Sequence, residues 1–283
     1  MHGPEILRRF LQVPSPVADK YGNHWQYNSR SDRHSKVGCW GIAFDLLQSS
    51  TLLRRHVEEA KVVMGVNHTL TDFGTGRPKK LDLVIARPNG VIPKDAKTFA
   101  GLADLYGVQL TGAEQHALSA LPPLHVSDVG AVLIALEAKA AMTAHVKAKP
   151  RLHDELNSSH LCVHGSSKQA LAIAYVQVNA ATEFVSSVTN NFSLAEQPAR
   201  VTKHKQPHDA LETIQKVMEI PRRSNNTENG FDGLGITVLD FKNDGGPVRL
   251  VEGPPAPKPG DVFHYGSMII RMANEYDTTF ANI

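Results

Sequence analysis

The 283-residue sequence predicts a mixed α/β fold, in which helices flank a central mixed sheet. Stretches with apolar residues at helical spacing alternate along the chain with short aliphatic runs that are typical of buried strands. Hydrophobic residues make up 41% of the chain and charged residues 20%, as in ordinary soluble globular proteins. The longest apolar runs are much shorter than a membrane-spanning helix, so we expect no transmembrane segment. We expect residues 1–283 to form a single domain.

Residues 1–35 are polar and aromatic, and we interpret them as an N-terminal arm with one short helix near residues 6–11. The apolar part of that helix is too short and too interrupted by charge to be a secretory signal. Trp25 and Tyr27 precede a basic cluster that consists of Arg30, Arg33, His34 and Lys36. The arm is either a segment that reaches a partner or a surface loop packed by its aromatic side chains.

Apolar residues recur at helical spacing from about residue 35 to residue 60. The hydroxyl-bearing residues 49–51 can divide this stretch into two helices, because one of them can cap the second helix. Glu58 and Glu59 lie near the end of the second helix, directly before a predicted strand.

Two strands are predicted next, at residues 61–71 and 79–87. The glycines and the proline of residues 72–78 indicate a turn, so we expect the two strands to pair as an antiparallel hairpin. Asp82 lies inside the second strand beside aliphatic residues. An acid is rare in such a position unless it is paired or functional.

The strand at residues 131–139 ends in two charges. Six apolar residues run without a break into Glu137, Ala138 and Lys139, and such a run is typical of a buried strand. Because residues i and i+2 share one face of a strand, the side chains of Glu137 and Lys139 project together. Burying a carboxylate or an ammonium group is unfavourable unless it is paired or binds a metal. The end of this strand therefore indicates a functional site.

Residues 91–124 are an insertion between the hairpin and this strand, and residues 181–283 are a C-terminal extension. Periodicity predicts further helices at residues 99–106, 112–121, 151–164, 209–218 and 262–276, and further strands at residues 170–180 and 236–241. We expect a polar loop with His145, Lys147 and Lys149 before a helix that begins after Pro150. We also expect Asp209 to cap the helix at 209–218, and residues 222–229 to be mobile.

Residues 36–180 form a recognisable order: helix, hairpin with Asp82, strand with Glu137 and Lys139, helix, strand. This order resembles the catalytic core of the PD-(D/E)xK nucleases, the superfamily that contains most type II restriction endonucleases. The chain departs from the family pattern in two ways. Leu81 stands where the family has proline, and the insertion lengthens the gap before Glu137. The resemblance implies a restriction-endonuclease-like core.

The resemblance implies that Asp82, Glu137 and Lys139 are catalytic. Asp82, Glu137 and the main-chain carbonyl of Ala138 would bind Mg²⁺, and Mn²⁺ can substitute for it. The chemistry agrees with this role, since magnesium binds through one or two carboxylates, waters and phosphate oxygens, and it activates a bound water. Lys139 would orient or deprotonate the attacking water and offset developing charge. The structural alternative is a simple ion pair between Glu137 and Lys139 where the strand leaves the core.

Other candidate residues are assigned less directly. Glu58 or Glu59 is either the extra acid that many members of the family carry at the end of the first helix, or a solvated helix-end residue. The basic residues that could contact DNA phosphates are Arg33, Lys36, Lys147, Lys149 and Arg151, and each could equally be a solvated surface residue. His145 could assist proton transfer or be a plain loop residue. Gln177 and Asn179 share one face of their strand, and one of them could reach the site or the DNA.

The sequence therefore predicts a magnesium-dependent endonuclease that acts on double-stranded DNA, with a type II restriction endonuclease as the first hypothesis. A homodimer is expected, because cutting both strands of a duplex usually requires two active sites. The alternatives are a repair, recombination or phage-defence nuclease without strict sequence specificity, and an inactive DNA-binding or structural protein of the same fold. The net charge of +2 does not by itself indicate a nucleic-acid-binding protein. The two distant cysteines favour an intracellular protein without a disulfide framework or a zinc site. The resemblance to restriction endonucleases implies a prokaryotic, cytoplasmic protein.

Overall fold

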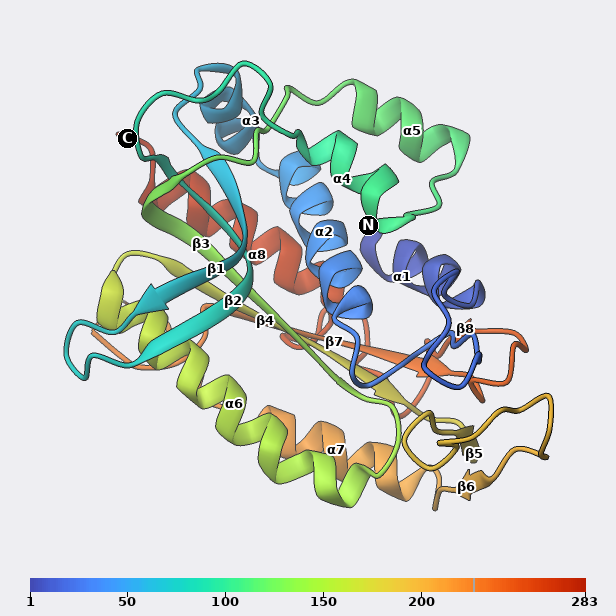
Figure 1. Cartoon of the computed structure of the whole chain (residues 1–283). Coiled ribbons are helices and arrows are strands. Elements are labelled where there is room, and N and C mark those ends of the chain that lie inside the picture. Colours follow the sequence, from blue (N-terminus) through green and yellow to red (C-terminus); the bar gives the residue numbers. More distant parts are fainter. Residues whose placement is uncertain (226) are drawn as a thin grey trace.

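The computed structural model describes residues 1–225 and 227–283, and in it a sheet lies between two layers of helices (Figure 1). The helices are α1 (Gly3–Gln12), α2 (Arg33–Ser49), α3 (Thr51–Glu58), α4 (Phe99–Tyr106), α5 (Gly112–Ser119), α6 (His145–Ser166), α7 (His208–Met218) and α8 (Tyr265–Thr279). The strands are β1 (Val63–Thr71), β2 (Pro78–Pro88), β3 (Val129–Ala141), β4 (Leu171–Asn179), β5 (Glu183–Val185), β6 (Val201–Lys203), β7 (Gly233–Asp240) and β8 (Arg249–Leu250). The predicted mixed α/β fold is confirmed.

The central sheet has six strands in the order β1-β2-β3-β4-β7-β8. Strands β1, β2 and β3 form an antiparallel meander, whereas β3, β4 and β7 are parallel neighbours. Helix α6 supplies the crossover that two adjacent parallel strands require between β3 and β4. The predicted hairpin, the strand with Glu137 and the helix and strand after it are therefore present in the predicted order.

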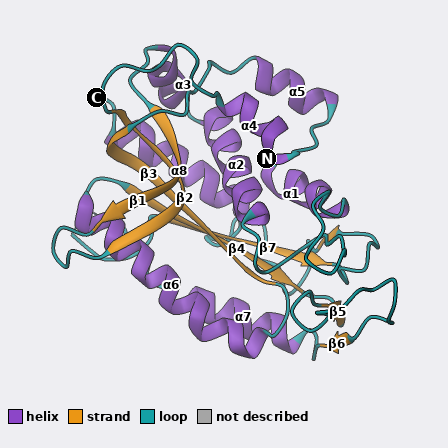
Figure 2. Cartoon of the chain, viewed as in Figure 1, coloured by secondary structure: helices purple, strands orange, loops and turns teal. Residues whose placement is uncertain are grey.

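Each face of the sheet is covered by its own set of helices (Figure 2). Successive side chains of a strand point to opposite faces of the sheet, so each central strand contributes residues to two hydrophobic cores, one on each face. Leu136 and Tyr175 face a core shared with α1, α2, α3, α4 and α8. Ala135 and Val176 face a second core shared with α6 and α7. The candidate catalytic residues of β3 therefore lie on the side of the sheet that α6 covers.

The predicted helices and strands are present, and apart from the start of α6 their ends differ from the prediction by up to three residues: α1 and β7 begin three residues earlier, and α8 begins three residues later. Three further differences concern α6, Asp209 and the segment 222–229. Helix α6 begins at His145 rather than after Pro150, because the buried imidazole of His145 contacts the carbonyl oxygen of Asn179 at 2.9 Å and holds the first turn in place. Asp209 lies inside the first turn of α7 rather than at its N-cap, and its carboxylate accepts a hydrogen bond from the amide of Lys205. In the polar segment 222–229 the side chain of Arg223 is buried, and residue 226 lies outside the described residues.

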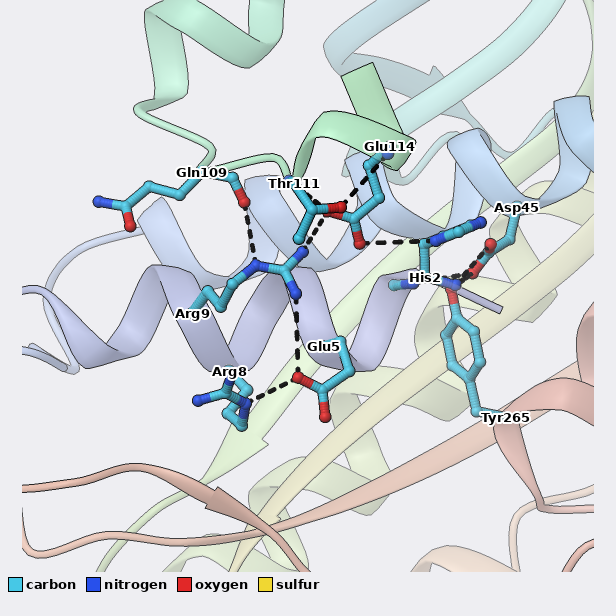
Figure 3. Close-up of polar contacts among 10 residues, drawn as sticks. His2, Glu5, Arg8, Arg9, Asp45, Gln109, Thr111, Glu114 and Tyr265 are labelled. Atoms are coloured by element: carbon cyan, nitrogen blue, oxygen red, sulfur yellow. Dashed lines mark hydrogen bonds and ion pairs between the residues drawn. The ribbon is translucent and has the colours of Figure 1, made fainter. Parts of the chain in front are cut away.

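Helix α1 is attached to the rest of the protein by a buried polar network (Figure 3). The carboxylate of Asp45 on α2 accepts hydrogen bonds from the amides of His2 and Gly3, each at 2.8 Å, and from the hydroxyl of Tyr265 at 2.9 Å. A carboxylate at a helix N-terminus satisfies free amides and interacts favourably with the helix dipole. Arg9 extends the attachment through an ion pair with Glu114 on α5. The network connects α1, α2, α5 and α8.

Replacing Asp45 with alanine is expected to lower the free energy of unfolding by about 3 kcal/mol. The change removes charged hydrogen bonds and leaves two amides and one hydroxyl unpaired in a buried place. Urea unfolding measures the loss. Asp95→Ala is the matched control, since Asp95 is exposed. Equal unfolding midpoints for the two variants would show that the network contributes little.

Candidate active site

The candidate site lies where β2 and β3 separate. Their last paired residues toward the site are Leu83 and Leu136. Beyond that pair the carboxylate of Asp82 takes the place of a strand carbonyl, and it accepts a hydrogen bond of 2.9 Å from the amide of Ala138. The next residues along each strand are Asp82 and Glu137. Glu137 shares the α6 face of β3 with Ala135, and the carboxylate of Asp82 contacts Ser35 at the start of α2.

Lys139 joins Glu137 to α6. Its ammonium group lies 2.7 Å from Glu137 Oε1 and 3.2 Å from Glu155 Oε2. The guanidinium of Arg151 contacts the other oxygen of Glu155 at 3.2 Å. Arg151 and Glu155 are four residues apart and so share one face of α6, but nothing in the sequence indicates that Glu155 reaches Lys139. Such a contact between a strand and a later helix has no local signature.

A pocket of about 220 Å³ gives solvent access to this cluster. Its walls come from the N-terminal segment, the first turn of α2, the ends of β2 and β3, and α6. They include Tyr27, His34, Ser35, Asp82, Ala138, Lys139, Arg151 and Glu155. The hydroxyl of Ser35 lies 3.3 Å from Asp82 Oδ1, which brings the N-terminus of α2 against the site. Ser35 was not predicted as a site residue.

Burial and neighbouring charges shift the pKa values of the three ionisable groups of the cluster. Burial raises the pKa of Asp82, and the Ala138 amide and Lys139 oppose that rise. Burial also raises the pKa of Glu137, where Lys139 opposes the rise and the neighbouring charge of Asp82 adds to it. Burial alone would lower the pKa of Lys139, but attraction by Glu137 raises it, so the ammonium stays charged. The buried carboxylate of Glu137 thus pairs with the Lys139 ammonium, and the half-buried carboxylate of Asp82 lies near both.

One atom of the cluster lacks a partner. Glu137 is 3% exposed, and within residues 1–225 and 227–283 its Oε2 atom accepts no hydrogen bond. A buried carboxylate oxygen without a donor is unfavourable. Magnesium fits this donor set, because it binds through one or two carboxylates together with waters and substrate phosphates. Among the described residues no group of three or more acids, histidines or cysteines forms a complete protein site, so the remaining ligands would come from water and substrate.

Glu58 and Glu59 are not part of this cluster. Both lie at the C-terminal end of α3, and Figure 1 shows α3 next to the C-terminal end of α2. Ser35, which contacts Asp82, lies in the first turn of α2, at the opposite end of that helix. Glu58 is exposed, and Glu59 pairs with Lys61 at 2.9 Å. That hydrogen bond with Lys61 lowers the pKa of Glu59. The geometry therefore favours the interpretation of both as solvated helix-end residues.

The predicted phosphate-contacting residues differ in their surroundings. Arg151 lines the pocket and is 76% exposed at its side chain, whereas Lys147 lies exposed in the first turn of α6. Lys36 pairs with Asp32 at 2.8 Å, and Lys149 pairs with Glu212 on α7. Arg33 stacks on Phe10, with its guanidinium 4.7 Å from the ring centre.

Three of the polar candidates are buried. His145 anchors the first turn of α6, and burial lowers its pKa. The side-chain amide of Asn179 connects neighbouring segments of the fold, because it donates hydrogen bonds to the main-chain carbonyls of Met142 and Phe241 at 3.1 and 3.0 Å. Gln177 donates weakly to the carbonyl of His34 at 3.4 Å. Of the three, Gln177 is thus the one in contact with a residue of the pocket wall.

Comparisons with protein-family models, with curated proteins and with solved structures gave no match for this chain. Within the described part of the chain no helix has both the length and the apolar character needed to cross a bilayer.

Proposed function

We propose that this protein is a magnesium-dependent endonuclease that hydrolyses phosphodiester bonds of double-stranded DNA. The observation that carries the proposal is the buried carboxylate of Glu137, whose Oε2 atom accepts no hydrogen bond, next to the half-buried Asp82 and the charged Lys139, which both line a solvent-accessible pocket. A structural ion pair would not need a second acid or an accessible pocket. The order of strands around the site agrees with the core expected from the resemblance to PD-(D/E)xK nucleases.

The residues have separable roles in this proposal. Asp82, Glu137 and the carbonyl of Ala138 would hold Mg²⁺ or Mn²⁺, which would neutralise phosphate charge and activate water when bound. The amide of Ala138 keeps the carboxylate of Asp82 in position. Lys139 is held in its charged form, so it acts as a hydrogen-bond donor that orients the attacking water and stabilises negative charge. Glu155 positions Lys139 through their contact of 3.2 Å.

Digestion of supercoiled plasmid DNA with magnesium or manganese tests the proposal. Discrete fragments would support a type II restriction endonuclease, and sequencing of the fragment ends would identify its site. A smear would support a general repair, recombination or phage-defence nuclease. If plasmid, single-stranded and methylated DNA all stay intact while DNA binding is retained, the protein is a binding module and the proposal is wrong. Sedimentation of the DNA complex tests the expected homodimer.

The magnesium concentration needed for half-maximal cleavage is expected to rise as the pH is lowered toward and below the raised pKa values of the two acids. Burial raises the pKa of Asp82 and of Glu137, so protons compete with the cation above the ordinary range of carboxyl groups. For each proton that magnesium must displace, the required magnesium concentration rises by up to about tenfold per pH unit below the raised pKa. Magnesium titrations of the cleavage rate at several pH values measure the effect. A requirement that does not change with pH would contradict the assignment of these ligands.

A further inference from the structure

A second pocket adjoins the candidate active site, and we call it the aromatic pocket. It has a volume of about 280 Å³, and Phe10, Asp19, Trp25, Tyr27, Arg33 and His34 are among the residues that line it. Tyr27 and His34 also line the pocket with Asp82 and Lys139, and their rings lie 4.8 Å apart. The two pockets therefore share a wall, and an occupant of one lies next to the other.

The walls of the aromatic pocket are held in a fixed arrangement. The indole of Trp25 donates a hydrogen bond of 2.7 Å to Asp19, whose other oxygen accepts from the amides of Tyr21 and Asn23 at 2.8 and 3.0 Å. The side chain of Asn23 in turn donates to the carbonyl of Phe192 at 2.8 Å. These contacts fix residues 19–25, so the ring of Trp25 stays in place without a ligand. A preformed pocket loses little entropy on binding.

Arg33 supplies an unused cation at this pocket. Its guanidinium stacks on Phe10, and across residues 1–225 and 227–283 its side chain donates no hydrogen bond and forms no ion pair. Arg33 is half-buried, and this burial lowers the pKa of its guanidinium. A guanidinium has five donors that match phosphate oxygens and the acceptor edges of bases. An arginine left without partners in a wall is therefore suited to a ligand.

We propose that the aromatic pocket receives one unstacked nucleobase of the DNA substrate, from the nucleotide next to the cleaved phosphodiester. This inference rests on the proposed nuclease function and specifies the form of DNA that the site accepts. The rings of Trp25 and Tyr27, which line the pocket, offer aromatic surface for stacking of a base, and the ring of Phe10 is covered by Arg33. Arg33 and Asp19 then offer a donor and an acceptor to the base edge or to its phosphate.

The chemistry of the walls selects this occupant. A simple anion would use Arg33 but not the aromatic rings, and an organic cation would be repelled by Arg33. The volume is near the lower limit for small-molecule pockets, which suits one ring system rather than a base pair. Because a paired base cannot reach such a pocket, the base must be flipped out of the duplex or be unpaired already.

Binding of labelled DNA to the Asp82→Asn protein tests the inference without cleavage. The probes are a paired duplex, the same duplex with one extrahelical base, the same duplex with an abasic residue at that position, and the single strand. We expect the duplex with the extrahelical base to bind more tightly than the paired duplex, because no base pair has to be opened. It should also bind more tightly than the abasic duplex, which has no base to enter the pocket. Tightest binding to the single strand would support the pocket and identify the substrate base as already unpaired. Equal affinity for all four probes would overturn the inference.

Two variants localise the effect. Arg33→Ala removes the unpaired guanidinium, and Val17→Trp places a bulky group at the rim from a residue that is 76% exposed. Each should reduce the preference for the extrahelical base by about 5- to 150-fold, the range expected for lost base stacking. Val91→Trp is the matched control, because Val91 is 95% exposed and lies in the insertion.

The two proposals fail in different ways. If the wild-type protein cuts DNA and the pocket variants keep the same base preference as Val91→Trp, the aromatic pocket has another role and the nuclease assignment stands. If no DNA is cut but base-dependent binding is present and is lost in both pocket variants, the pocket is supported and the nuclease assignment is wrong.

Discussion

Glu137→Gln and Lys139→Met are each expected to lower the rate of DNA cleavage by about 100- to 10,000-fold, the range typical of a lost acid–base or charge-stabilising group. Glutamine keeps the size of Glu137 but removes the charge that pairs with Lys139 at 2.7 Å. Methionine keeps the aliphatic stem of Lys139 but removes the ammonium group. Initial rates of plasmid nicking at saturating magnesium measure both effects.

The fold should survive these two changes, which separates a catalytic role from a structural one. Each variant removes one member of a buried ion pair, so unfolding in urea must be measured in parallel. Lys80→Met is a matched control, because Lys80 is an exposed lysine on β2. A folded Glu137→Gln or Lys139→Met protein that cuts at the wild-type rate would show that the cluster is a structural ion pair.

Arg223→Met is expected to lower the free energy of unfolding by about 3 to 5 kcal/mol, the usual loss when one partner of a buried charge pair is removed. Arg223 is 2% exposed, and its guanidinium donates to Asp232 at 2.7 Å and to the carbonyls of Lys168 and Ala170, each at 2.9 Å. Asp232 also accepts from the amide of Ala172 at 2.7 Å. Without Arg223 the carboxylate stays buried beside β4, and its pKa, already raised by burial, rises further.

A second substitution identifies the cause of that loss. Asp232→Asn in the Arg223→Met background removes the uncompensated charge and keeps an acceptor for Ala172, so part of the stability should return. Chemical unfolding of the single and double variants gives the coupling energy. Arg87→Met, at an exposed arginine on β2, should unfold like the wild type. If Arg223→Met lowers the free energy of unfolding by less than Arg87→Met does, the Arg223–Asp232 ion pair contributes nothing to stability.

The sequence predicted most of the elements near the candidate site because their causes are local. An unbroken aliphatic run marks β3, the glycines and proline at residues 72–78 mark the hairpin turn, and Ser50 caps α3 by accepting a hydrogen bond of 2.9 Å from the amide of Leu53. The short strands β5, β6 and β8 were not predicted. They have only two or three residues, which is too few for a periodic pattern.

The amino-acid sequence by itself determined the periodic elements and the placement of Glu137 and Lys139 on one face of a strand, because these depend on spacing within a few residues. The tertiary structure alone decided that Glu155 contacts Lys139, that Glu58 and Glu59 lie away from the site, and that Arg223 is buried. It also decided that the N-terminal aromatic residues form a pocket beside Asp82 rather than a free arm. Burial and charge pairing depend on residues that are distant in the chain, and a single sequence contains no local signal for them.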